Sequence, residues 1–144
     1  MADVEILQVP VEAVAGAWPM ALPHLMPAVE MSRGCFEPED IELLCARGDM
    51  QLWLAVDGED VLAAYVTEIV QYPRKRRIRA VFAGGKPHTM DHWLEPMVQA
   101  IEAFSKAWSC SGIEAVGRKG WSKVVDGEIV GTYLCRDYAA MEMH

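Results

Sequence analysis

The sequence contains no long uninterrupted apolar run and no paired-cysteine motif. No stretch approaches the roughly 20 apolar residues that cross a bilayer. Residues 1–9 have neither the positive start nor the apolar core of a secretion signal. The four cysteines are scattered: Cys35, Cys45, Cys110 and Cys135. Without a C-x-x-C pair a zinc site is not indicated, so we expect intracellular free thiols, no metal site and no membrane association.

Positive charge is also scarce. The chain has 13 lysines and arginines against 21 aspartates and glutamates, a net charge of −8, which argues against general nucleic-acid binding. The one concentration of cations lies at an expected hairpin tip: Arg74, Lys75, Arg76 and Arg77. Such a run is either a solvated turn or a docking patch for an acidic partner surface or nucleic acid. Our hypothesis for partner binding, to a protein first of all, is this patch.

What the chain does contain is typical of a folded domain. Hydrophobic residues make up 52% and charged residues 24% of 144 residues, enough to bury a core. No linker, internal repeat or low-complexity segment divides the chain. We therefore predict one domain over residues 1–144, with residues 138–144 loosely held.

The first third of the chain predicts a strand and helices. Residues 4–9 predict an opening strand. Residues 11–31 mix helix formers with three prolines four residues apart. Because each proline removes a backbone donor and clashes one turn back, we predict two short helices or a kinked one there. Another helix is predicted to begin near Glu37, with acidic residues in its first turn, and to end at Gly48.

The middle of the chain predicts a meander. From Gln51 the hydrophobic period changes to two, which predicts three antiparallel strands over residues 51–56, 61–72 and 77–82. A loop is predicted at Gly84-Gly85-Lys86-Pro87.

The rest predicts a crossover. Apolar residues recur at spacings of three and four from Trp93 to Trp108, which predicts a helix. A short strand over 113–116, a helical piece over 121–125 and a last strand over 129–135 follow. A strand–helix–strand unit has parallel strands and binds anions at the loop that begins its helix.

This order of elements resembles the GNAT superfamily of acyl-CoA-dependent N-acetyltransferases. Several short sequence motifs are similar to those of GNAT-like proteins from tailed bacteriophages and prophages. Examples are Gln51-Leu52-Trp53, Val66-Thr67-Glu68-Ile69 and Gly117-Arg118-Lys119-Gly120-Trp121. The resemblance covers roughly residues 40–135. It implies an α/β fold of GNAT-like architecture, with a mixed central sheet flanked by helices. It also implies a phage or prophage protein, located in the host cytoplasm or the virion, with other virion proteins as partners.

The resemblance also implies a place for acetyl-CoA. Family members hold the coenzyme pyrophosphate on backbone N–H groups between the fourth strand and the next helix, which assigns this role to Phe82, Gly84, Gly85 and Lys86. The family's second glycine spacing is absent here, and Pro87 has no N–H to donate. Asp91 places a carboxylate where the anion would lie, although it would make a good N-cap. The coenzyme loop is therefore degenerate.

Catalytic residues are implied less directly. Many family members have a glutamate on the fourth strand and a tyrosine after the fifth. Residues 77–82 contain no carboxylate, and residues 118–125 contain no tyrosine. Glu68 and Tyr133 are the nearest substitutes, although a paired strand glutamate and a half-buried core tyrosine are the commoner roles.

Two functions follow from these residues. The first is a structural or binding module without a cofactor, within the virion or its assembly. The alternative is an acetyl-CoA-dependent N-acetyltransferase acting on a small amine or a protein lysine.

Overall fold

The computed structural model describes residues 3–115, 127–128, 130–131 and 134–138. Their elements are β1 (Val4–Val9), a short 3₁₀ turn (Val11–Ala13), α1 (Val14–Glu30), α2 (Pro38–Ala46), β2 (Gln51–Asp57), β3 (Asp60–Gln71), β4 (Arg76–Gly85), α3 (Met90–Ala107) and β5 (Gly112–Ala115). The strands form one sheet in the order β1-β2-β3-β4-β5. All neighbours are antiparallel except β4 and β5, which are parallel. The mixed sheet and the α/β class are as predicted.

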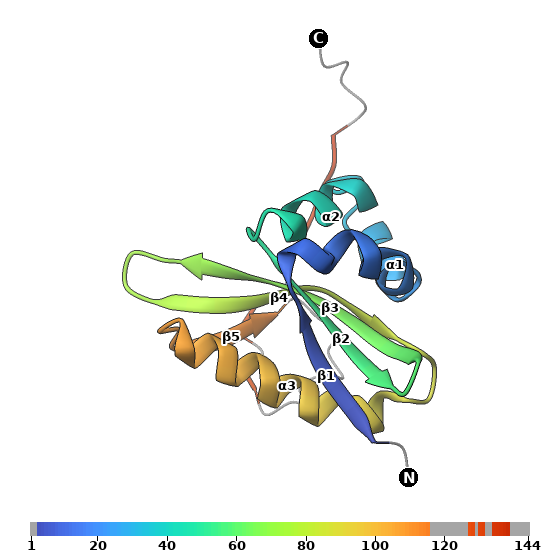
Figure 1. Cartoon of the computed structure of the whole chain (residues 1–144). Helices are drawn as coiled ribbons and strands as arrows, with labels where there is room; N and C mark the ends of the chain where they lie inside the picture. The colour runs from blue at the N-terminus through green and yellow to red at the C-terminus, as the bar shows by residue number, and fades with distance from the viewer. Residues whose placement is uncertain (1–2, 116–126, 129, 132–133, 139–144) are drawn as a thin grey trace.

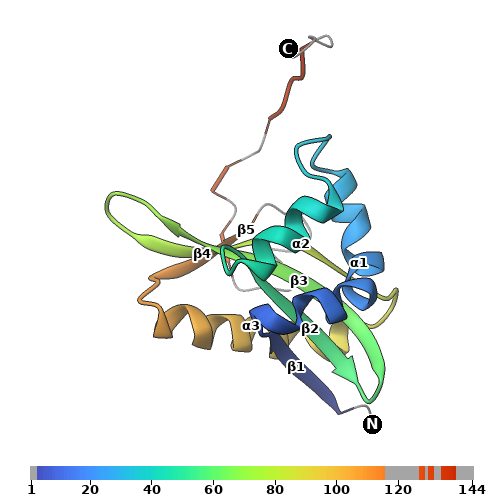
Figure 2. The same cartoon turned by 45° about the horizontal axis from the view of Figure 1, so that its top comes forward.

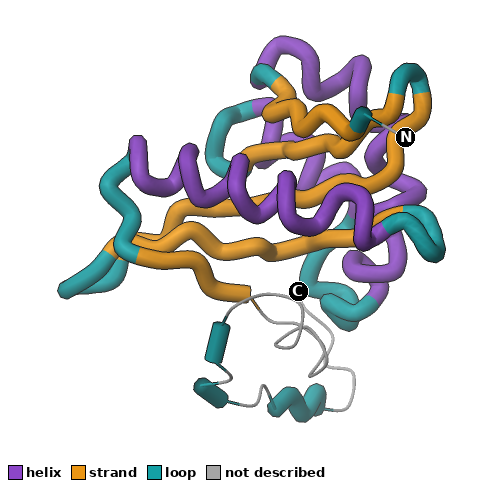
Figure 3. The backbone as a smooth tube through the Cα atoms, turned by 90° about the horizontal axis from the view of Figure 1, so that it is seen from below, coloured by secondary structure: helices purple, strands orange, loops and turns teal. Residues whose placement is uncertain are grey.

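The sheet lies between two helical layers. Helices α1 and α2 cover one face and α3 covers the other (Figure 1), and the view from below shows α3 lying over the sheet, roughly along the strands (Figure 3). Successive residues of a strand point to opposite faces, so Leu52 and Leu54 pack under α1 and α2 while Trp53 packs against α3. On α3, Trp93, Met97 and Ile101 are buried. The predicted alternation of apolar residues in the strand and the predicted apolar face of the helix from Trp93 onward are thus confirmed.

Helix α1 excludes one of the two forms predicted for residues 11–31. It is one helix of 17 residues that contains Pro19, Pro23 and Pro27, not two short ones. All three prolines are exposed, while Leu25 and Val29 between and beside them are buried. A spacing of four residues keeps the prolines on one side of the helix. The carbonyls that lose their helical N–H partners therefore lie toward water, which satisfies them.

The described residues after β5 differ from the predicted closing strand. The described part of the predicted strand over 129–135 comprises Val130, Gly131, Leu134 and Cys135, and none of these is in a strand. Val130 is 90% and Leu134 86% exposed. Asp137 forms an ion pair with Arg33 in the α1–α2 connection, with Nε and Oδ2 2.9 Å apart. The predicted helical piece over 121–125 lies outside the described residues. None of the helices described has the length and hydropathy to cross a membrane.

Candidate functional site

The two parallel strands share only four residues each. Residues 77–80 of β4 pair with residues 112–115 of β5, while β4 runs on to Gly85 paired with β3. Opposite β3 the register passes from Val66↔Phe82 to Thr67↔Ala80, so Val81 is the extra residue of a β-bulge. Bulges bend a strand and are common beside active sites. The bulge thus divides β4 where its pairing with the described part of β5 ends.

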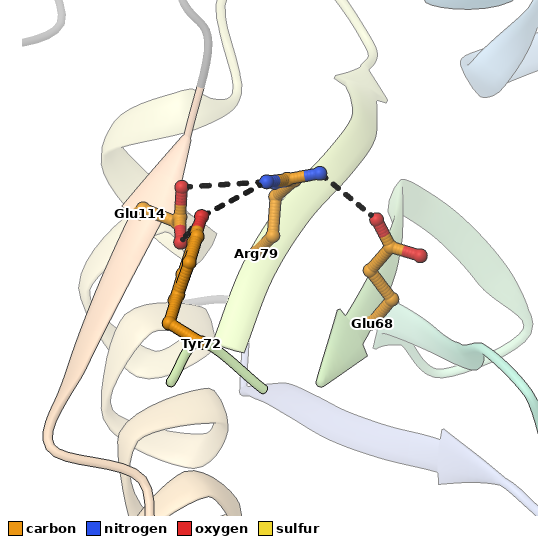
Figure 4. A network of polar contacts seen from close by, with 4 residues as sticks. All are labelled: Glu68, Tyr72, Arg79 and Glu114. Atoms are coloured by element: carbon orange, nitrogen blue, oxygen red, sulfur yellow. Dashed lines mark hydrogen bonds and ion pairs between the residues drawn. The ribbon is translucent and has the colours of Figure 1, made fainter. Parts of the chain in front are cut away.

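A polar network lies on the first half of β4 (Figure 4). Arg79 Nη1 donates to Glu68 Oε1 of β3 at 3.2 Å, and Arg79 Nη2 donates to the Tyr72 hydroxyl at 3.1 Å. Tyr72 in turn donates to Glu114 Oε1 of β5 at 2.7 Å, and Glu114 Oε2 lies 3.6 Å from Arg79 Nη2. One guanidinium therefore connects carboxylates from the two strands that flank β4.

This network lies on the sheet face opposite α3. Ile78 packs in the cluster formed with α3, and the next residue, Arg79, points to the other face. The side chains of Arg79, Glu68 and Glu114 are 35%, 28% and 27% exposed, so water and small molecules reach them. Two carboxylates and one guanidinium give a formal charge of −1.

Neighbouring groups stabilise the positive charge of Arg79. Burial lowers the pKa of Arg79, but the hydrogen bond to Tyr72 and the nearby charges of Glu114 and Glu68 outweigh it. The pKa of Arg79 is therefore raised above its ordinary value, and the network keeps its cation at every physiological pH.

The second half of β4 has a different environment. A Cβ on Gly84 would lie well inside van der Waals distance of the His24 carbonyl oxygen in α1, and a Cβ on Gly85 would lie 2.7 Å from Trp93 Cζ2 in α3 and 2.8 Å from the Leu62 carbonyl oxygen. The two glycines therefore let both helices approach the sheet. Gly84 and Gly85 are strand residues, which corrects the first half of the predicted loop over 84–87. Lys86 and Pro87 lie in the connection to α3, as predicted, although Lys86 N still donates to Leu62 O at 2.8 Å.

The connection from β4 to α3 ends at Thr89, the N-cap of α3. Its hydroxyl donates to Lys86 O at 2.7 Å and accepts from the Trp93 indole at 3.0 Å, so it makes no side-chain cap bond. Asp91 is the second residue of the helix and 80% exposed, which corrects its expected N-cap role. The first turn of α3 is thus left without a side-chain cap, and its N–H groups suit an anion.

Neither a family model nor a curated protein matches this sequence at a significant level. Solved structures do match over nearly the whole chain. An aminoglycoside acetyltransferase from an uncultured soil metagenomic sample, in complex with sisomicin, has a TM-score of 0.68 at 9% identity, over 96% of this chain and 97% of its own. The ribosomal-protein-alanine N-acetyltransferase of Brucella melitensis biovar Abortus 2308 has a TM-score of 0.67 at 10% identity, over 94% and 100%.

A GNAT family acetyltransferase of Staphylococcus aureus has a TM-score of 0.62 at 11% identity, over 96% of this chain and 100% of its own. The chain has the GNAT fold. At these identities the likeness concerns the fold, because GNAT-fold proteins that differ this much in sequence need not share an activity.

The structure describes one of the two predicted catalytic residues. Glu68 lies in the network, paired with Arg79, whereas Tyr133 lies outside the described residues. Tyr72 and Glu114 were missed by sequence reasoning. The signal for Glu114 is its position directly opposite Arg79 in the parallel pair, which becomes visible only once that register is known. The carboxylates that β4 lacks are therefore supplied by β3 and β5.

The residues predicted to bind the coenzyme lie at the other end of β4 and directly after it. Phe82 is 4% exposed and packs edge-to-face on Phe36 with ring centroids 5.3 Å apart, so its side chain is not free for a ligand. The Lys86 side chain is 46% exposed, with Nζ 4.0 Å from Asp60 Oδ1. Coenzyme binding by Phe82, Gly84, Gly85 and Lys86 stays a prediction.

The basic hairpin of residues 74–77 divides into two pairs. Arg76 donates from Nε to Gln71 Oε1 and from Nη1 to Trp108 O, both at 2.8 Å, and Arg77 lies 6.0 Å from the ring centre of Tyr72. Arg74 and Lys75 are exposed, with no ion pair to the described residues. Within the same described residues no group of three or more His, Cys, Asp or Glu is arranged for a metal.

Proposed function

We propose that this protein is an N-acyltransferase that moves an acyl group from acyl-coenzyme A to an amine. The observation that carries the proposal is the polar network of Glu68, Tyr72, Arg79 and Glu114 at the point where the described pairing of β4 and β5 ends. Acetyltransferases with the same fold along their whole length support it. No solved structure named above supports the virion role that the sequence motifs implied, so we prefer the enzymatic alternative.

The network offers the groups that amide formation needs. Acyl-coenzyme A, when bound, supplies a thioester whose acyl group an amine can accept. The amine must lose a proton, and Glu68 is our candidate base: only its Oε1 is bonded to Arg79, and Oε2 has no hydrogen-bond partner among the described residues. Tyr72 carries the one hydroxyl of the network and is our candidate to hold the proton that the leaving thiolate takes. The formal charge of −1 favours a cationic amine as the acceptor.

The residues for the coenzyme fit in part. The uncapped first turn of α3 and the Lys86 ammonium would face the pyrophosphate, since both favour negative charge. Pro87 removes one donor from this stretch. Helices α1 and α3 fill the space beside Gly84 and Gly85, so the coenzyme would have to use main-chain groups on the side of β4 away from β3. Because Lys86 N donates to Leu62 O, the alternation of the ladder turns the main chain of Gly85 to that side and that of Gly84 to β3.

Binding of acetyl-CoA tests the proposal directly. Isothermal titration calorimetry with acetyl-CoA is expected to give micromolar affinity, and Lys86→Glu to weaken it. Lys106→Glu is the matched control, because Lys106 is an exposed cation at the far end of α3, paired with Glu102. No heat of binding at millimolar acetyl-CoA would falsify the transferase and return the protein to the class of binding modules.

Turnover tests the assigned base. With a panel of diamines, aminoglycosides and lysine peptides, Glu68→Gln is expected to lower kcat on the order of 100-fold while the affinity for acetyl-CoA is unchanged. Glu102→Gln, on the outer side of α3, is the control and is expected to leave kcat unchanged.

A further inference from the structure

The outer half of β3 has one open edge. Its pairing with β2 ends at Gln51↔Thr67, whereas its pairing with β4 continues to Gln71↔Arg76. Residues 68–71 therefore have β4 on one side and no described strand on the other, and the β3–β4 hairpin projects beyond the rest of the sheet (Figures 1 and 2). In an antiparallel ladder alternate residues turn both N–H and C=O to the same side. Two of these four residues thus present their main chain to the open side.

The residues of this edge lack the usual protective features. Natural edges are usually guarded by lysine, proline or a bulge, but residues 68–71 read Glu-Ile-Val-Gln, and Ile69 and Val70 are partly exposed. The one charged side chain, Glu68, is turned to Arg79. The two bonds from Arg76, to Gln71 and to the end of α3, fix the hairpin against the body. A strand that adds here meets a preformed template, so little ordering of the protein is needed.

The space beside the edge has a defined length and an end. Four residues of strand span about 13 Å, and the space then meets Gln51, where β2 begins. Gln51 also lines a cavity of about 370 Å³, together with Met50, the ends of β1 and α2, Phe104 of α3 and Trp108, the residue that follows α3. Trp108 is 54% exposed. The end of an added strand would therefore lie beside an aromatic-lined cavity of the size that binds small ligands.

The exposed cations at the hairpin tip favour a peptide with acidic residues at its first positions. Arg74 and Lys75 stand exposed at the hairpin tip, beside the outer end of the open edge. Since β2 runs antiparallel to β3, a segment that continues the line of β2 begins at the tip and ends at Gln51. Its first residues would meet the two cations and its last residue the cavity. Carboxylates first and an apolar side chain last is the order that fits.

We propose that the open edge of β3, residues 68–71, binds an extended peptide segment of a partner protein by antiparallel strand addition. Acidic residues of the peptide face Arg74 and Lys75, and an apolar residue enters the cavity beside Trp108. Main-chain hydrogen bonds provide the affinity and the two ends provide the selectivity. This inference does not depend on the transferase proposal, although Glu68 belongs to both: strand addition uses the main chain of residues 68–71, whereas the transferase uses the Glu68 carboxylate.

The probe is the hexapeptide Glu-Asp-Val-Thr-Val-Leu, acetylated and amidated, added to the full-length ¹⁵N-labelled protein. Saturable shifts of the amide signals of residues 68–71 are expected at peptide concentrations up to about 2 mM, since single added strands bind weakly. No shift at these four residues at that concentration overturns the proposal. Two isomeric probes, N-methylated at both valines or at aspartate and threonine, test the mode of binding. One methylates the edge that pairs with β3 and is expected to bind at least tenfold more weakly, while the other binds as before. Equal behaviour of the two isomers excludes strand addition.

Variants test the two ends. The pair Arg74→Glu with Lys75→Glu is expected to weaken binding at least fivefold at low salt, and Trp108→Ala to weaken it without loss of the folded spectrum. The pair Arg33→Glu with Arg136→Glu makes the same change in net charge away from the hairpin and is expected to have no effect. Sedimentation of the free protein adds a last check. If the signals of residues 68–71 shift with protein concentration and a dimer forms without peptide, the edge belongs to a second copy of this chain and the peptide proposal is wrong.

Discussion

The two halves of β4 show how one strand serves two purposes. Residues 77–80 pair on both sides and hold a charged network on a face that water reaches. Residues 81–85 are pressed between α1 and α3, and the strand ends in two glycines because no side chain fits there. The bulge at Val81 lies between the two halves. Charged chemistry therefore lies where the helices leave the sheet open, and close packing begins where they cross it.

The largest effect is expected at the packed half. In Gly84→Ala the new methyl group would overlap the His24 carbonyl oxygen, which belongs to the backbone of α1 and cannot turn away. We expect the free energy of unfolding in urea to fall by about 3 kcal/mol, since overpacked cores must move whole elements.

Gly16→Ala is the matched control for this substitution. Gly16 lies in α1, the helix that also contains His24, and a Cβ at Gly16 would have nothing within 4 Å. Alanine should stabilise the helix by about 0.5–1 kcal/mol. If Gly84→Ala were as stable as the unmodified protein, the close approach of α1 to β4 would be wrong.

The second effect belongs to the boundary between the halves. Thr67 lies opposite Ala80 and is fully buried; its hydroxyl accepts from the Trp53 indole at 2.9 Å and donates to Gln51 Oε1 at 2.8 Å. Thr67→Val keeps the shape but leaves the buried indole N–H without an acceptor, which should cost about 2 kcal/mol of unfolding free energy. Thr67→Ser keeps the hydroxyl, so a loss as large as that of the valine variant would show that the methyl group, not the hydrogen bond, matters.

Sequence patterns predicted the elements of both halves but not their difference. The strands and α3 follow from local periodicity, and the predicted strand over 77–82 lies inside the observed β4. Two adjacent glycines suit a turn and a close helix contact equally well, because both need the absence of a Cβ. Only the position of α1, more than 50 residues earlier in the chain, decides between them.

The charged half was harder to predict for a related reason. Glu68 was named because it lies near the expected family position, but Glu114 depends on the register between β4 and β5, which are joined by α3. Registers of this kind are set by tertiary packing and not by neighbours in sequence. The two-helix alternative for residues 11–31 was wrong, because all three prolines lie on the exposed side of α1, where water satisfies the carbonyls that lose their N–H partners.

The third effect concerns the charged half itself. Arg79→Met removes the donor that connects Glu68, Tyr72 and Glu114. Because all these side chains are about a quarter to a third exposed, water solvates the two remaining carboxylates, and the loss should be only about 1 kcal/mol in urea unfolding. Arg74→Met, at the exposed tip of the same hairpin, should change stability by less than about 0.5 kcal/mol. A larger loss for the tip than for Arg79 would contradict the ion-pair geometry.

The smallest effect separates the halves by pH. His24 lies where α1 crosses the packed half; burial lowers its pKa below the ordinary value of 6.5, a hydrogen bond to the Val61 backbone opposes this, and the charge of Lys86 adds to it. Since the unfolded chain binds the proton more readily, stability is complete above pH 6.5 and falls as the pH drops through that value toward the lowered pKa of His24. The urea midpoint should therefore fall between pH 7.5 and pH 5 by more in the unmodified protein than in His24→Gln. Arg79 remains charged throughout this range, so Arg79→Met should keep the same pH dependence as the unmodified protein. If the pH dependence were lost in Arg79→Met and kept in His24→Gln, the acid sensitivity would arise in the charged half of β4, and this prediction would be wrong.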